Sequence, residues 1–277
     1  MSQKNSEQFI RTCLLLILSL LVIAIVLPMG WIVLSSLKNN NEFFSTPLKL
    51  PGRLLYVNYQ NAWNLGLSQY FINSVLVSGV SIALTIVFGS ACAYGLTRFY
   101  FKGQTVLFYL ILGGLLLSPQ VAVLPLYRML NQFGIYNTYW AMILPYVAFR
   151  LPFAIFLIRS YFISFPRELE ESAYIDGCNA LTTFTRIVLP ISKPILASTA
   201  IVTGIFVWNE FLFALIFIEN KSLMTIPIGL STFRDALTTD YTTMLAGIVI
   251  GSLPIMILYL AMQRSFIKGL TAGSVKG

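Results

Sequence analysis

Residues 168–190, ELEESAYIDGCNALTTFTRIVLP, form a polar and charged stretch inside an otherwise apolar chain. Within this stretch the spacing E-x-A-x3-G-x9-I-x-L-P is formed by Glu171, Ala173, Gly177, Ile187, Leu189 and Pro190. Apolar runs long enough to cross a bilayer lie on both sides of it. The pattern therefore predicts a water-exposed, structured loop between membrane-spanning helices.

The composition supports a membrane location for the rest of the chain. Of 277 residues, 57% are hydrophobic and 10% are charged, and histidine is absent. Soluble domains carry roughly 25% charged residues, so a soluble fold would leave too much apolar surface in water. The net charge of +8 comes from basic residues scattered singly between apolar runs, which argues against nucleic acid as a partner.

Six apolar runs have the length of about 20 residues that a helix needs to cross a bilayer. They lie near residues 12–36, 71–97, 105–127, 139–163, 195–218 and 242–262. Prolines in the third, fourth and sixth runs predict interrupted helices there, which neighbouring helices can tolerate. The sequence thus predicts an all-α integral membrane protein, with residues 1–277 forming one transmembrane domain embedded in the lipid bilayer.

The positive residues predict the orientation of these six spans. With both termini in the cytoplasm, eleven lysines and arginines fall in internal segments and six in external ones. Positive residues favour the cytoplasmic side, so cytoplasmic N- and C-termini are expected. The loop at about 164–194 is then cytoplasmic, and two segments, about 38–70 and 219–241, are external.

Local signals predict two short helices in the cytoplasmic loop. Pro166 and three glutamates suit the start of the first helix, and Gly177 suits its end. A second helix follows from about Asn179 and ends at Pro190. An ordinary solvated connection would show the same signals. The apolar side chains of Leu169, Ala173, Ile187 and Leu189, however, indicate burial against a partner.

The whole pattern resembles a known family. Besides the loop, the stretches SPQVAVLPLY (118–127), GIYNTYWAMILPY (134–146), WNEFLFAL (208–215) and GLTAGSVKG (269–277) are similar to binding-protein-dependent ABC sugar importer permeases of the carbohydrate-uptake, maltose-permease-like group. The loop departs from the common family form at Ser172, where a second alanine is usual. The resemblance implies the six-helix fold of type I ABC importer permeases.

The resemblance also implies the function and the partners. The chain would be the non-catalytic permease subunit that moves a sugar or oligosaccharide from an extracytoplasmic binding protein into the cytoplasm. Its partners would be two ABC ATPase subunits, which bind the ATP, and a second homologous permease, in a bacterial or archaeal cell (inner) membrane. No metal or cofactor is expected in this chain. Its implied ATPase-coupling residues are Glu171, Ala173, Asp176, Gly177, Ile187, Leu189 and Pro190.

Polar groups at membrane depth form a second candidate site. An ionised side chain there costs at least about 2.5–3.5 kcal/mol, so each one needs a partner or a watery cavity. The predicted translocation-pathway residues are Gln120, Arg150, Trp208, Asn209 and Glu210. Two interpretations remain open. In the first, Glu210 and Asn209 tie helices together, with Arg150 or a group on a partner subunit as the partner. In the second, these groups line the solute path, and Trp208, Phe211 or Tyr146 offers an aromatic face to a sugar. The alternative function, an ion-coupled secondary transporter, would use Glu210 and Arg150 as its coupling pair.

The external segment 219–241 has an apolar centre that a plain loop does not need. The resemblance implies that this centre reaches the solute-binding protein. The predicted binding-protein contacts are Met224, Thr225, Ile226, Pro227, Ile228, Gly229 and Leu230. The tail 271–277 is a short cationic terminus by composition, and the resemblance implies contact with the ATPases.

Overall fold

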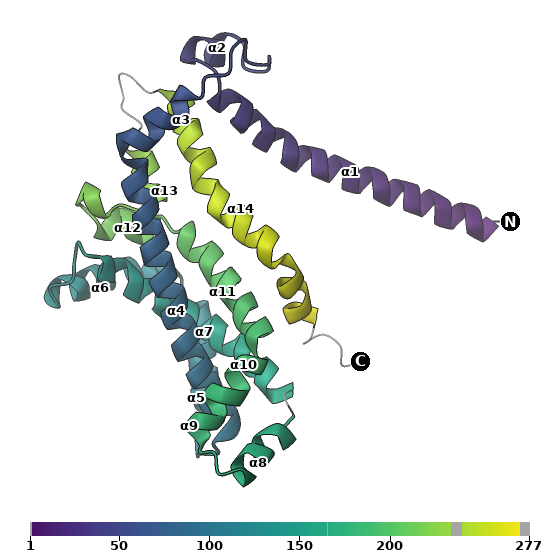
Figure 1. Ribbon diagram of the computed structural model, residues 1–277, viewed down its shortest axis with the longest axis vertical. Coiled ribbons are helices and arrows are strands. Elements are labelled where there is room, and N and C mark those ends of the chain that lie inside the picture. Colours follow the sequence, from purple (N-terminus) through teal and green to yellow (C-terminus); the bar gives the residue numbers. More distant parts are fainter. Residues whose placement is uncertain (1, 165, 234–239, 272–277) are drawn as a thin grey trace. The chain divides into compact units, whose positions relative to one another are not determined.

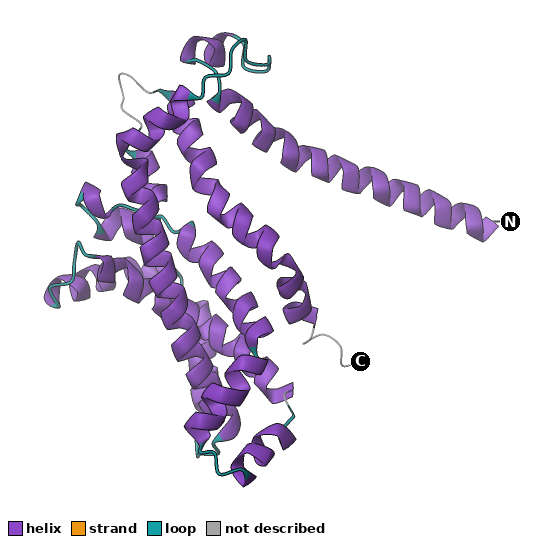
Figure 2. Cartoon of the chain, viewed as in Figure 1, coloured by secondary structure: helices purple, strands orange, loops and turns teal. Residues whose placement is uncertain are grey.

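The computed structural model describes residues 2–164, 166–233 and 240–271, and describes side chains within these ranges from residue 10 to residue 260. The described chain is helical and contains no strand (Figure 2). The longer helices are α1 (Ser2–Ser36), α4 (Ser68–Arg98), α5 (Gln104–Gly113), α6 (Pro119–Gln132), α7 (Tyr139–Ser164), α8 (Glu168–Ile175), α11 (Lys193–Trp208) and α14 (Tyr241–Thr271). The predicted all-α fold is confirmed, and the predicted tail at 272–277 lies outside the described residues.

Short helices connect or extend the long ones. They are α2 (Asn40–Ser45), α3 (Val57–Ala62), α9 (Ala180–Thr183), α10 (Leu189–Ile191), α12 (Leu212–Phe217) and α13 (Ile226–Ser231). The segment η1 (Trp63–Leu67) contains a kink at Gly66, which has φ of 112°. A π-helical turn, η3 (Phe184–Val188), and two 3₁₀ turns, η2 (Gly114–Leu116) and η4 (Lys221–Leu223), are the remaining elements of the described residues.

Four helical stretches are long and apolar enough to cross a membrane, and two bent helix pairs bring the number to as many as six. The four are Ile10–Ser36, Val57–Arg98, Tyr139–Ser164 and Tyr241–Leu260. The membrane window of the first is 0% buried within the chain, so its apolar side chains face outward along its whole length. Such a surface requires lipid or another apolar partner, which agrees with a multi-pass membrane protein.

The predicted third span, 105–127, is interrupted, as the prolines in this run predict. Helix α5 and turn η2 end at Leu116, and α6 begins at Pro119 at an angle of 100° to them. Leu117 and Ser118 between them have extended backbone, with ψ of 119° and 130°. The residue before a proline is biased to this conformation, and proline then suits the first position of the next helix.

The predicted fifth span, 195–218, in contrast, was expected to be a continuous helix and is not. Helix α11 ends at Trp208, a non-helical stretch follows, and α12 begins at Leu212. The second bent pair is instead Ala180–Ile191 with Lys193–Trp208, at 76°. The prediction of breaks in the fourth and sixth spans is wrong as well. Helix α7 continues through Pro145 and Pro152, and α14 continues through Pro254.

The chain divides into two compact units, residues 1–67 with 230–252 and residues 68–229 with 253–277. In the first unit, the buried Lys38 donates hydrogen bonds to the carbonyls of Thr46 (3.0 Å) and Pro47 (2.9 Å). The Asn58 amide donates to the carbonyls of Ser36 and Lys38, both at 2.8 Å. The bond to Ser36 satisfies a carbonyl that the end of α1 leaves unpaired, and all four bonds order residues 36–58 of the first unit.

In the second unit, α4 packs against α7 and α11 (Figure 1). A core cluster at one end of this bundle joins α4 and α7 to turn η3. It consists of Ala93, Tyr94, Ile158, Phe162 and Val188, and Phe184 packs against it. The cluster anchors the charged segment 166–194 to the bundle.

Candidate functional site

The charged segment folds as two capped helical pieces beside one end of α4 (Figure 1). Gly177 follows α8 with φ of 83°, a left-handed conformation that suits glycine. The Cys178 amide donates to Ala173 (2.9 Å) and the Gly177 amide donates to Tyr174 (3.1 Å), which closes the helix end. At the next helix, the Asn179 side chain accepts from the Thr182 amide at 2.9 Å. The two predicted helices, the stop at Gly177 and the start at Asn179 are confirmed, whereas Pro166 lies before α8 and the second helical stretch continues through Pro190 to Ile191.

The predicted coupling residues differ in exposure. Glu171, Asp176, Gly177 and Pro190 are exposed, and Ile187 and Leu189 are half-buried. Ala173 is buried, so its side chain packs inside the segment and offers almost no surface to a partner. The exposed apolar surface of the segment comes instead from residues that the spacing does not mark: Leu169, Tyr174, Ile175 and Leu181.

One functional feature of this segment was missed by the sequence analysis. The Glu170 carboxylate forms an ion pair with Arg98, the last residue of α4, at 2.5 Å. Glu170 and Glu171 are adjacent, yet one faces the bundle and the other faces outward. Neighbouring side chains on a helix point about 100° apart. Two adjacent glutamates are therefore expected to lie on different faces, but the sequence does not say which glutamate faces the bundle.

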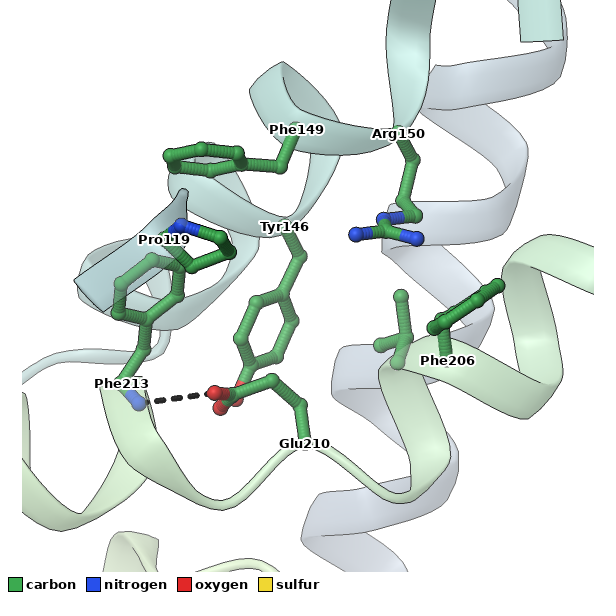
Figure 3. Close-up of a pocket in the computed structure, with 8 residues that line it drawn as sticks. Pro119, Tyr146, Phe149, Arg150, Phe206, Glu210 and Phe213 are labelled. Atoms are coloured by element: carbon green, nitrogen blue, oxygen red, sulfur yellow. Dashed lines mark hydrogen bonds between the residues drawn. The ribbon is translucent and has the colours of Figure 1, made fainter. Parts of the chain in front are cut away.

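A small cavity in the second unit is lined by polar and aromatic side chains (Figure 3). Its lining residues are Pro119, Tyr146, Phe149, Arg150, Phe206, Val207, Glu210 and Phe213. The cavity has a volume of about 80 Å³. Sites for drug-sized ligands enclose about 300–1,000 Å³, whereas one water occupies about 30 Å³. In this conformation the cavity holds water-sized contents and is too small for a sugar.

Glu210 is held by three donors in this cavity. Its carboxylate accepts from the Tyr146 hydroxyl at 2.6 Å, from the Phe213 amide at 2.9 Å and from the Ala214 amide at 3.3 Å. The two amides belong to the first turn of α12, where negative charge is favoured. This capping explains why the helix stops before Glu210 and restarts after it, and why the predicted fifth span is interrupted.

Arg150 does not pair directly with Glu210. Among the described residues, the Arg98–Glu170 contact is the one ion pair within 4.0 Å. The Arg150 guanidinium instead lies 4.2 Å from the centre of the Phe206 ring, a cation–π contact (Figure 3). The hypothesis that Glu210 ties helices together holds, because Tyr146 lies on α7, but the expected Arg150 partner is wrong.

The other predicted pathway residues lie apart from the cavity lining. The Gln120 side chain bonds to Ser118, and the Asn209 side chain donates to the Ile205 carbonyl at 2.7 Å. Trp208 is buried against Phe71 with ring centres 5.9 Å apart. Of the five predicted pathway residues, Arg150 and Glu210 thus line the same cavity, and Gln120, Trp208 and Asn209 do not. Phe206 and Phe213 were missed because apolar residues in an apolar span carry no distinguishing signal.

Replacing Glu210 by glutamine is expected to preserve assembly, because one amide oxygen still accepts a hydrogen bond. Replacing Glu210 by leucine is expected to lower stability, since each buried donor left without an acceptor costs about 1–3 kcal/mol. Thermal unfolding of the purified complex measures both, with Asn209→Ala as an exposed neighbouring control. If the glutamine variant were as unstable as the leucine variant, the negative charge itself would be essential.

The segment predicted to be external is bonded to the N-terminal end of α4. The buried Asn73 amide donates to the carbonyls of Ser222 and Met224, both at 2.8 Å. The Ser74 hydroxyl accepts from the Ile226 amide at 2.8 Å. These bonds fix the backbone of residues 222–226 along the helix, so this part of the segment is packed within the second unit, whereas residues 234–239 lie outside the described residues.

The start of the external segment is bonded to the turn before α7. The Asn137 side chain accepts from the amides of Glu219 and Asn220, both at 3.0 Å. The Tyr136 hydroxyl donates to the Glu219 carboxylate at 3.0 Å. Burial and this bond to Glu219 raise the pKa of Tyr136 to about 12, so the hydroxyl remains a donor at neutral pH.

The apolar centre of the external segment has an internal explanation. Met224, Thr225, Ile226, Ile228 and Gly229 are buried within the chain, and Pro227 and Leu230 are half-buried. Packing inside the protein therefore accounts for these apolar side chains without an external partner. Contact of this segment with a binding protein remains a prediction, carried by its exposed edge at Lys221 and Ser222.

A helical chain with up to six stretches long and apolar enough to cross a bilayer, and a folded polar loop, has the character of a multi-pass membrane protein. The family model described as "Binding-protein-dependent transport system inner membrane component" matches residues 85–271. The chain belongs to this family.

Individual relatives agree with this assignment. The chain is 50% identical to the probable ABC transporter permease protein YurM of Bacillus subtilis, over 96% of this chain and 89% of the relative. It is 34% identical to the diacetylchitobiose uptake system permease protein NgcG of Streptomyces coelicolor, over 92% and 85%. Its fold matches a chain of a bacterial ABC transporter involved in the import of the acidic polysaccharide alginate, with a TM-score of 0.83, 20% identity and coverage of 96% and 99%.

Proposed function

We propose that this chain is the permease subunit of an ATP-driven importer that carries a sugar or oligosaccharide into the cytoplasm. Family membership supplies the class, and the relative named for diacetylchitobiose uptake supports a carbohydrate substrate. The solute arrives on an extracytoplasmic binding protein and passes between this chain and a second permease in the inner membrane. Two ATPase subunits bind and hydrolyse the ATP, and this chain carries out no catalytic step.

The observation that carries this proposal is the folded segment 166–194. It is capped at both helices, anchored by the α4–α7 core cluster, and presents the exposed Glu171 beside exposed apolar side chains. A simple connection between two spans needs none of these features. A well-anchored surface that carries both charged and apolar side chains suits the docking of another protein that moves it. The proposed partner at this surface is the ATPase.

The alternative, an ion-coupled carrier using Glu210 and Arg150, has less support. Three donors hold the Glu210 carboxylate, and Arg150 lies over Phe206. A carboxylate that couples transport to an ion must bind and release that ion in each cycle. The three hydrogen bonds to Glu210 favour a fixed structural role instead.

Reconstitution tests the proposed function. Vesicles that contain this chain, its companion permease and the ATPase are expected to accumulate labelled oligosaccharide when ATP and the binding protein are supplied. Vesicles with this chain alone are the control and are expected to accumulate none. Accumulation by the chain alone, driven by a proton or sodium gradient, would contradict the proposal.

A further inference from the structure

The ion pair between Arg98 and Glu170 lies on a different face of α8 from Glu171. The Arg98 Nε donates to the Glu170 carboxylate at 2.7 Å, and an Arg98 terminal nitrogen lies 2.5 Å from the same oxygen. The two side chains are 9% and 5% exposed, so the pair is almost fully removed from solvent. A partner protein that docks on the surface of α8 therefore meets Glu171 and not Glu170.

The surroundings of this pair join both halves of the charged segment to α4. The Tyr94 hydroxyl lies 3.4 Å from the Glu170 carboxylate. The Tyr94 ring packs against Phe184 of η3, with ring centres 4.8 Å apart, and against Phe162 of α7 at 6.4 Å. The last turns of α4 thus hold α8 through a charge pair and η3 through aromatic packing.

The opposite end of α4 holds the external segment. Asn73 and Ser74 bond to residues 222–226, as described above. From Ser74 to Arg98 the helix is unbroken, and at 1.5 Å per residue it extends about 36 Å. One rigid element therefore contacts the charged segment at one end and the external segment at the other.

We propose that Glu170 is a positioning residue that transmits displacement of the charged segment to α4 and, through α4, to the external segment at residues 222–226. This inference rests on the proposed function, in which an ATPase moves the charged segment. Glu171 receives the partner and Glu170 attaches the segment to the helix. Without the buried charge pair, the segment still docks and η3 remains packed on the bundle, but α8 no longer delivers its movement directly to α4.

The test uses the assembled transporter in vesicles with its binding protein, and it measures uptake and ATP hydrolysis together. Glu170→Gln is expected to keep the ATPase bound and basal hydrolysis at the native level, while uptake per ATP falls at least tenfold. Glu168→Gln is the matched control, since Glu168 is exposed on the first turn of the same helix. A merely structural role would lower the yield of complex without changing uptake per ATP.

Two further variants keep the inference testable if Glu170→Gln is recovered poorly. Glu170→Asp keeps the charge but shortens the side chain, and an intermediate ratio of uptake to hydrolysis is expected. The exchanged pair, Glu170→Arg with Arg98→Glu, is expected to recover most of the ratio that either single change loses. A native ratio in Glu170→Gln or Glu170→Asp would overturn the inference. If uptake by the wild-type transporter did not need ATP, the proposed function itself would be overturned.

Discussion

Replacing Glu171 by lysine is expected to weaken ATPase binding at least about 30-fold and to abolish ATP-driven uptake. Glu171 is exposed on α8, and the family resemblance implies a basic partner for it on the ATPase. Truncation of one member of a buried interfacial charge pair costs about 2–5 kcal/mol. The lower figure is already about 30-fold in affinity, and a lysine adds repulsion between like charges.

The measurement is co-purification of the ATPase with the tagged permease, followed by uptake in vesicles. Glu168→Lys is the matched control, because both glutamates are exposed and both lie in the first turn of α8. Both changes also remove a favourable interaction with the helix dipole, worth about 0.3–1 kcal/mol, so that effect cancels in the comparison. Equal loss from the two variants would show that general negative charge is needed, and unchanged binding in Glu171→Lys would remove Glu171 from the interface.

Features set by neighbouring residues were predicted well from the sequence. Gly177 and Asn179 were placed correctly because a left-handed helix end and a side-chain cap depend on residues only a few positions apart. The first, second, fourth and sixth spans were also located, since a run of apolar residues is a local property. A break in the third span was predicted from its prolines, but neither proline nor hydropathy specifies that the chain turns by 100° at Pro119.

Features set by distant residues were not predictable in the same way. Arg98 and Glu170 are 72 positions apart, and neither residue has a neighbour that signals the other. The interruption at Glu210 depends on Tyr146 and on the amides of α12, so apolarity alone favoured one continuous helix. Apolarity likewise predicts that the segment 224–230 is buried, but it does not say whether the covering surface belongs to the same chain.

Gly229 provides a direct test of that last point. A Cβ at position 229 would lie 2.2, 2.5 and 2.6 Å from atoms of the Tyr70 ring, well inside normal contact. Tyr70 is buried on α4, so its ring has little room to move. Gly229→Ala is therefore expected to destabilise the protein by about 1–3 kcal/mol, the usual cost of overpacking. Gly79→Ala is the control, because no atom lies within 4 Å of the added methyl group.

A double-mutant cycle decides what covers the external segment. If the segment packs on Tyr70, the combination of Gly229→Ala with Tyr70→Ala loses less stability than the sum of the single changes, because removal of the ring relieves the clash. Thermal unfolding of the purified complex, without binding protein, measures the stability of the wild type, the two single variants and the double variant. If the effects of the two substitutions on stability were additive, and Gly229→Ala alone did not lower stability, the segment would not be packed on α4. The apolar residues 224–230 would then again need a partner outside the chain, and α4 would lose its connection to the outer surface.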